Sequence, residues 1–281
     1  MVHVESFVLV FVAGLITALA TGLGALPFFF VDDVSDRLNV VLWGLASGIM
    51  VAASVFGLAS EGFAEADPWP SVLAVGAPVA VARAAPLVVG LLTGVLLVVV
   101  AHEMIEGYEV NPRQYEEADF RKLLLVLGVL TVHSFPEGVA VGVSFAELNL
   151  AGGLSILGFS VPLLAVFMTV AISIHNVPEG VAVSIPLQSM GVSRPKMVWW
   201  AVFSSLPQPV GAVLAYAFVR AARAFLPVGF GFAAGAMVYL VLTEFIPEAL
   251  DVGEELPGGG YRELVGGVTA GVVVMVPLVL V

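Results

Sequence analysis

The sequence of 281 residues contains no cysteine and little charge. The lack of cysteine excludes disulfides, thiolate metal ligands and a cysteine nucleophile, so a metal site in this chain must use nitrogen and oxygen ligands. Only 11% of the residues are charged, whereas about 25% is usual in soluble domains. With so few polar side chains, the chain cannot be a soluble enzyme, a nucleic-acid-binding protein or a disordered tail.

Hydrophobic residues make up 60% of the sequence, and no polar stretch is long enough to fold alone. A membrane-spanning helix needs about 20 mostly apolar residues, and eight segments reach that length. We therefore predict an all-α, polytopic bundle of eight transmembrane helices that forms a single domain over residues 1–281. The predicted spans are 6–30, 38–60, 86–105, 123–146, 162–187, 197–219, 228–248 and 264–281. The apolar segments 70–85 and 151–161 stay ambiguous between interfacial segments and parts of neighbouring spans.

The basic residues predict the orientation of the bundle, because lysine and arginine are enriched in cytoplasmic loops. With eight spans, both termini lie on the same side of the membrane. One side receives Arg37, Arg113, Arg121, Lys122, Arg194, Lys196 and Arg262, and the other receives Arg83, Arg220 and Arg223. We therefore expect a multi-pass plasma-membrane protein with both termini extracellular. Most of the 22 acidic residues lie in loops, where we interpret them as a solvated rim.

Two segments of the fourth and fifth predicted spans repeat each other. Residues 133–141 read HSFPEGVAV and residues 175–183 read HNVPEGVAV, so seven of nine positions are identical. Consecutive spans run antiparallel, which predicts an inverted repeat of the kind that many transporters use to build a substrate site near the middle of the membrane. In each copy histidine and glutamate are four residues apart and therefore project from one face of the helix.

The repeat predicts a site with four ligands, formed by His133, Glu137, His175 and Glu179. Imidazole and carboxylate together suit Zn²⁺, Fe²⁺, Mn²⁺, Cd²⁺ and Co²⁺ better than copper(I) or magnesium. Two carboxylates and two neutral imidazoles carry a charge of −2, which one divalent cation neutralises. A catalytic metal centre is the rival interpretation, but the metalloprotease arrangement His-Glu-x-x-His is absent. Four symmetric ligands on two helices favour a site for binding and release.

The two segments resemble the motifs of the ZIP family of divalent metal transporters, in the prokaryotic branch whose members carry His-Asn-x-Pro-Glu-Gly on both helices. Residues 175–180 match this pattern fully, and residues 133–138 match it except at Ser134. Further similarity covers residues 47–54, 209–213 and 231–237. The resemblance implies eight helices, extracellular termini, a metal site between helices four and five, and movement of metal toward the cytoplasm.

Departures from the family pattern concern a second metal position. Family members often carry asparagine at the position of Ser134 and glutamate at the position of Gln208, and in relatives with two metals the two glutamates bridge both ions. Here Ser134, Asn176 and Gln208 are all neutral. We therefore expect one tightly bound metal at the four main ligands, with these three residues as a vestigial or transient second position. Gln208 also lies between Pro207 and Pro209, which predicts an irregular helix there.

Together these features predict a transporter, not an enzyme, that moves Zn²⁺, and with it Fe²⁺, Mn²⁺ or Cd²⁺, into the cytoplasm by alternating exposure of this site. The metal is the substrate and no cofactor is expected. The expected partners are a divalent metal ion and the lipid bilayer, with no nucleic acid, and a homodimer is compatible with the sequence. Two alternatives stay open: an intramembrane metal-dependent enzyme and a metal sensor without transport. Glu244 with Glu248, and His102 with Glu103, are either an exit relay or solvated charges at helix ends.

Overall fold

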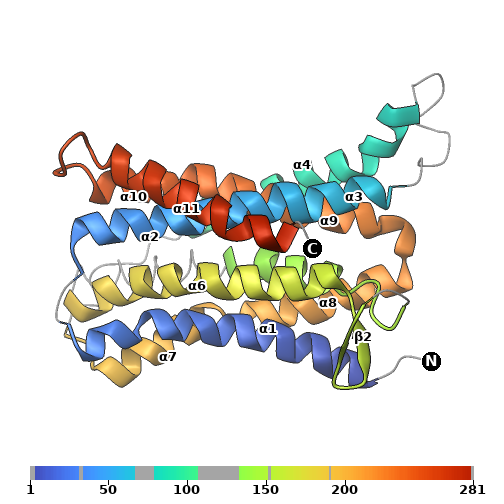
Figure 1. Cartoon of the computed structure of the whole chain (residues 1–281), viewed down its shortest axis with the longest axis horizontal. Helices are drawn as coiled ribbons and strands as arrows, with labels where there is room; N and C mark the ends of the chain where they lie inside the picture. The colour runs from blue at the N-terminus through green and yellow to red at the C-terminus, as the bar shows by residue number, and fades with distance from the viewer. Residues whose placement is uncertain are drawn as a thin grey trace.

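The structure, a computed structural model, describes residues 4–31, 34–66, 79–106, 133–150, 153–189 and 191–279. In these parts the chain forms long helices that lie side by side along one axis (Figure 1). The labelled elements are α1 Val4–Gly24, η1 Leu26–Phe29, α2 Asp36–Ala52, η2 Ala53–Ala59, α3 Ser60–Ala64, α4 Val79–Glu106, β1 Leu154–Ile156, β2 Phe159–Val161, α6 Leu163–Ser189, α7 Arg194–Ser204, α8 Pro207–Ala221, η4 Arg223–Phe225, α9 Leu226–Leu240, η5 Val241–Phe245, α10 Ile246–Val252 and α11 Tyr261–Val279. A further helix covers residues 133–144, and we refer to it as helix 133–144.

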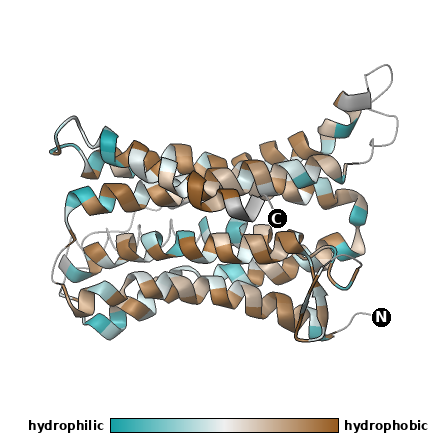
Figure 2. Cartoon of the chain, in the orientation of Figure 1, coloured by the Kyte–Doolittle hydropathy of each residue, from teal (hydrophilic) through white to brown (hydrophobic). Residues whose placement is uncertain are grey.

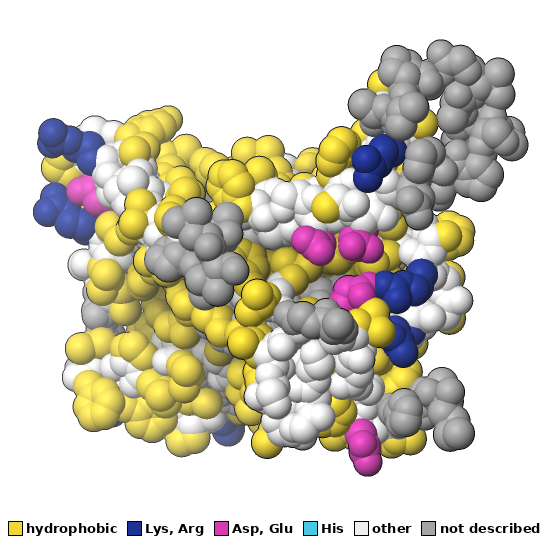
Figure 3. Space-filling view, turned by 45° about the vertical axis from the view of Figure 1, so that its right-hand side comes forward, with side chains coloured by type: hydrophobic (Ala, Val, Ile, Leu, Met, Phe, Trp, Pro, Cys, Tyr) yellow, Lys and Arg dark blue, Asp and Glu magenta, His cyan; other side chains and the backbone are white. Residues whose placement is uncertain are grey.

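The all-α, polytopic architecture expected from the sequence is confirmed. In the described residues, six helical stretches are long and apolar enough to cross a membrane. Figure 2 shows that apolar residues run along the helices, and Figure 3 shows hydrophobic side chains between charged ones near the two ends of one face. The predicted span 123–146 lies partly outside the described residues, and the span 264–281 corresponds to α11, which is not among the six. The number eight and the inverted repeat therefore stay predictions.

Three of the predicted spans are less regular than an ideal helix. The span predicted at 38–60 contains a π-helical turn, η2, between α2 and α3. The span predicted at 228–248 contains another, η5, between α9 and α10. The span predicted at 197–219 is interrupted between Ser204, where α7 ends, and Pro207, where α8 begins. The irregularity expected beside Gln208 is thus confirmed, and it places that residue in the first turn of α8.

A short β-hairpin occupies most of the ambiguous segment 151–161. Strands β1 and β2 pair antiparallel, with Ile156 opposite Phe159. The turn consists of Leu157 and Gly158, whose φ angles are 51° and 85°. Two positive φ angles suit a tight hairpin, but leucine rarely adopts one, which is why the sequence carried no recognisable turn signal here.

The helices pack in two groups, visible as an upper and a lower layer in Figure 1. In one group α2 packs against α11 and α10, and α4 packs against α9. In the other, α1 packs against α6, α7 and α8, and Gly138 of helix 133–144 meets the backbone of Gln208 in α8. Contacts between α2 and α6 join the two groups. Both segments of the sequence repeat, helix 133–144 and the middle of α6, belong to the second group.

Glycine sets the distance between α2 and α11, which gives a first testable prediction. A Cβ atom on Gly267 would lie 2.4 Å from the carbonyl oxygen of Val41, whereas a Cβ atom on the neighbouring Gly266 would meet nothing within 4 Å. We expect Gly267→Ala to lower the free energy of unfolding by about 1–3 kcal/mol, the usual cost of overpacking, and Gly266→Ala to change it by less than about 0.5 kcal/mol. Thermal and denaturant unfolding of both variants in detergent would measure this. Equal effects would contradict the close approach of the two backbones.

Candidate metal centre

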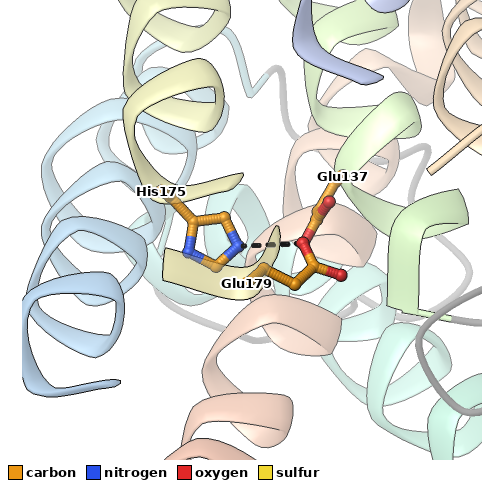
Figure 4. Close-up of side chains that lie close together, drawn as sticks. All are labelled: Glu137, His175 and Glu179. Atoms are coloured by element: carbon orange, nitrogen blue, oxygen red, sulfur yellow. Dashed lines mark hydrogen bonds and ion pairs between the residues drawn. The ribbon is translucent and has the colours of Figure 1, made fainter. Parts of the chain in front are cut away.

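Three of the four predicted ligands converge between helix 133–144 and α6. One ligand atom each from Glu137, His175 and Glu179 lies within 4.8 Å of the others. Nε2 of His175 is 3.1 Å from Oε1 of Glu137 and 4.0 Å from Oε2 of Glu179. Figure 4 shows the three side chains pointing toward one another, with Glu137 on one helix and the other two on α6. All three are fully buried, with exposed fractions of 0%.

The carboxylate of Glu179 is the most unusual group in this cluster. Both of its oxygen atoms are buried and have no hydrogen-bond partner among the described residues. An ionised carboxylate in that position costs free energy unless a donor or a cation neutralises it. Imidazole nitrogen and carboxylate oxygen atoms are ligands that Zn²⁺ and related divalent ions accept. The donor set and its burial therefore fit a dehydrated divalent cation.

A chain of neutral amides orients Glu137 from its other side. Nε2 of Gln208 donates a hydrogen bond to Oε2 of Glu137 at 2.5 Å. Nδ2 of Asn176 in turn donates to Oε1 of Gln208 at 3.1 Å and to the carbonyl oxygen of Thr17 at 2.7 Å. Two of the three residues expected at a second metal position, Asn176 and Gln208, thus form one hydrogen-bonded network that ends on Glu137.

His133, the fourth predicted ligand, lies beside the cluster. Its ring is 1% exposed and its Nε2 is 3.2 Å from Nε2 of His102 in α4. Nδ1 of His102 is 3.4 Å from Oε1 of Glu244 in η5. Ser134, next to His133, is buried as well.

The sequence left the role of His102 undecided, although a usable signal was present. The chain has only four histidines, and His102, His133 and His175 all lie at or next to this site. In an apolar bundle such scarce ionisable residues usually line a cavity or pathway. The small number of histidines alone was therefore a reason to expect His102 near the centre.

Comparisons with known proteins identify the family to which the chain belongs. A family model described as ZIP zinc transporter matches residues 108–278, which include both copies of the repeat. The chain belongs to the ZIP family of zinc transporters. ZIP proteins are transporters and not enzymes, so this multi-pass membrane protein is a metal transporter, and the interpretation as an intramembrane enzyme is excluded.

Several relatives in the ZIP family are similar over most of the chain. Zinc transporter GufA of Myxococcus xanthus is 31% identical over 95% of the chain and 96% of its own length. Zinc transporter ZupT of Corynebacterium aurimucosum is 29% identical over 93% of the chain and 92% of its own length. A candidate zinc transporter of Arabidopsis thaliana is 40% identical over 83% of the chain, but the match spans only 33% of that longer protein.

Proposed function

We propose that the chain carries Zn²⁺, and with it Fe²⁺, Mn²⁺ or Cd²⁺, from outside the cell to the cytoplasm through a site between helix 133–144 and α6. His133, Glu137, His175 and Glu179 act as its ligands. The observation that carries this proposal is the buried carboxylate of Glu179, which has no hydrogen-bond donor among the described residues and lies within reach of Glu137 and His175. The three relatives, which are named as zinc transporters, support zinc as the main substrate.

The site holds one metal ion tightly. Glu137 and Glu179 supply a charge of −2, which one divalent cation balances, while Ser134, Asn176 and Gln208 add no charge. The hydrogen bond from Gln208 to Glu137 supports this stoichiometry, because an N–H donor and a second cation compete for the same carboxylate oxygen. A second ion would bind only transiently.

Release toward the cytoplasm proceeds through His133 and His102 to Glu244. Nε2 of His133 is 3.2 Å from His102, and Nδ1 of His102 is 3.4 Å from the carboxylate of Glu244. The ion passes from one imidazole nitrogen to the next and then to a carboxylate oxygen, so it is never without a ligand. Glu248, one helical turn beyond Glu244, extends the path.

Alternating exposure requires that the ligand-bearing helices move against the others. Helix 133–144 and α6 belong to the group with α1, α7 and α8, whereas α2, α4, α9 and α11 pack in pairs with one another. In many transporters one such group moves against the other around a substrate site near the membrane centre. The group of α1, helix 133–144 and α6 to α8 is the one that moves.

Both termini lie outside the plasma membrane in this proposal. Support comes from the basic residues at the inner end of the bundle, where Arg37 pairs with Glu263 at 3.1 Å and Arg194 donates to the carbonyl oxygen of Phe29. Three of the seven basic residues assigned to the cytoplasmic side lie outside the described residues, namely Arg113, Arg121 and Lys122. The orientation therefore depends mainly on the sequence.

Uptake by proteoliposomes tests the function. Purified protein is reconstituted around an internal zinc indicator, external Zn²⁺ is added with Fe²⁺, Mn²⁺ or Cd²⁺ as competitors, and the assay is run at two lumenal pH values. We expect saturable uptake above that of protein-free liposomes, inhibited by each competitor. Tight metal binding without any flux would refute transport through the proposed site.

A further inference from the structure

The aromatic ring of Phe245 packs flat against one of the proposed metal ligands. The ring centroids of Phe245 and His175 are 5.4 Å apart and their planes are inclined by 17°, so the two rings are stacked. Trp43 in α2 also contacts Phe245, edge to face with centroids 4.9 Å apart. Phe245 is 1% exposed and lies in the π-helical turn η5, which supplies none of the four proposed ligands.

The stack takes the place of a hydrogen bond that most metal-binding histidines make and that His175 lacks among the described residues. In most metal sites the second ring nitrogen of the histidine donates to a carboxylate, a carbonyl oxygen or water, which fixes the orientation of the ring. Nε2 of His175 faces Glu137 at 3.1 Å, but its Nδ1 is buried and has no hydrogen-bond partner among the described residues. Among the described residues, the stack with Phe245 is therefore the contact that sets the plane of the imidazole.

We infer that Phe245 is a positioning residue for the metal centre: its ring holds the imidazole of His175 so that Nε2 points toward the two carboxylates. The inference rests on the proposed function, because it takes His175 as a ligand. Trp43 fixes Phe245 from the side, since an edge-to-face pair is a favourable aromatic geometry. The adjacent Glu244 reaches His102, so one π-helical turn contacts two histidines of the centre.

The test compares Phe245→Leu with two reference variants. Leucine keeps an apolar side chain but removes the flat ring, and Phe245→Tyr keeps the ring. Phe230→Leu is the matched control, because Phe230 is a buried phenylalanine of α9 that packs near Gly62. Each purified protein is titrated with Co²⁺, whose visible absorption reports coordination geometry, and with Cd²⁺ in equilibrium dialysis; proteoliposome uptake of Zn²⁺ gives KM and the maximal rate.

For Phe245→Leu we expect a Kd for Cd²⁺ about tenfold higher than that of the wild type, the lower limit for loss of an outer-shell partner. The KM for Zn²⁺ should rise by a similar factor at an unchanged maximal rate, and the Co²⁺ spectrum should change. Phe245→Tyr should stay within about threefold of the wild type, and Phe230→Leu should bind normally whatever its thermal stability.

A Phe245→Leu protein with wild-type Kd and Co²⁺ spectrum overturns the inference, even if it unfolds at a lower temperature, because Phe245 then contributes packing alone. Glu137→Ala separates this result from a failure of the proposed function. If Glu137→Ala loses metal while Phe245→Leu does not, only the positioning role is refuted. If Glu137→Ala binds metal as tightly as the wild type, the centre itself is misassigned and both proposals fail.

Discussion

Replacing Glu137 with alanine is expected to abolish Zn²⁺ uptake while leaving the helix bundle folded. The change removes one of two carboxylates and leaves a charge of −1 around a +2 ion. Loss of an outer-shell partner alone lowers metal affinity by about 10–100-fold, and loss of a ligand should exceed that. Uptake into proteoliposomes and Cd²⁺ binding by equilibrium dialysis measure the two effects.

The bundle should tolerate this substitution for a physical reason. Removing Glu137 takes away the carboxylate that Nε2 of Gln208 and Nε2 of His175 contact, which costs about 1–3 kcal/mol for a buried polar group. Against this, a buried negative charge disappears, and alanine favours the helical conformation. Size-exclusion chromatography and thermal unfolding should therefore show a folded protein.

Two further variants isolate the cause of the effect. Glu137→Gln keeps the length of the side chain and removes its charge, and it should also lose uptake, because metal binding needs the carboxylate. Glu147→Ala removes a glutamate that pairs with Arg223 outside the metal centre, and it should transport normally. Uptake retained in Glu137→Ala would refute the assignment of the centre.

The sequence was sufficient to predict the class of fold. In lipid the backbone N–H and C=O groups must bond to one another because water is absent, and a long apolar segment achieves this as a helix. The predicted span 162–187 corresponds to α6, Leu163–Ser189, and the span 86–105 lies inside α4, Val79–Glu106. The π-helical turns η2 and η5 could not be foreseen, because one extra residue in a turn changes neither composition nor hydrophobicity.

The sequence allowed prediction only of those residues of the candidate centre that belong to the repeat. Three of the four histidines and glutamates of the repeat, Glu137, His175 and Glu179, converge in the structure. His133, at the position equivalent to His175, lies beside them and contacts His102 instead. His102 and Phe245 belong to helices outside the repeat, and their contacts depend on which residues of α4 and η5 face the centre. That register is set by packing between helices, and a single sequence does not contain it. That these residues bind metal stays a prediction until the binding experiments are done.

Replacing Gln208 with glutamate is expected to raise the number of tightly bound metal ions from one per chain to two. In the wild type, the amide of Gln208 donates to Glu137 and accepts from Asn176. A carboxylate at this position still accepts from Asn176 but can no longer donate to Glu137. Two unit charges roughly 4 Å apart repel by about 4 kcal/mol at an effective dielectric constant of 20. A second divalent cation between the two carboxylates turns this repulsion into attraction.

Metal counting by mass spectrometry after exhaustive dialysis against Cd²⁺ or Zn²⁺ measures the stoichiometry. Gln208→Ala is the matched control: it removes the same hydrogen bond to Glu137 without adding charge, so it should still bind one ion. If Gln208→Glu also retains one ion, the neutral amide does not set the stoichiometry. Two tightly held ions in the wild type would show that the charge of Glu137 and Glu179 does not limit occupancy, because neutral ligands would then suffice to hold the second cation.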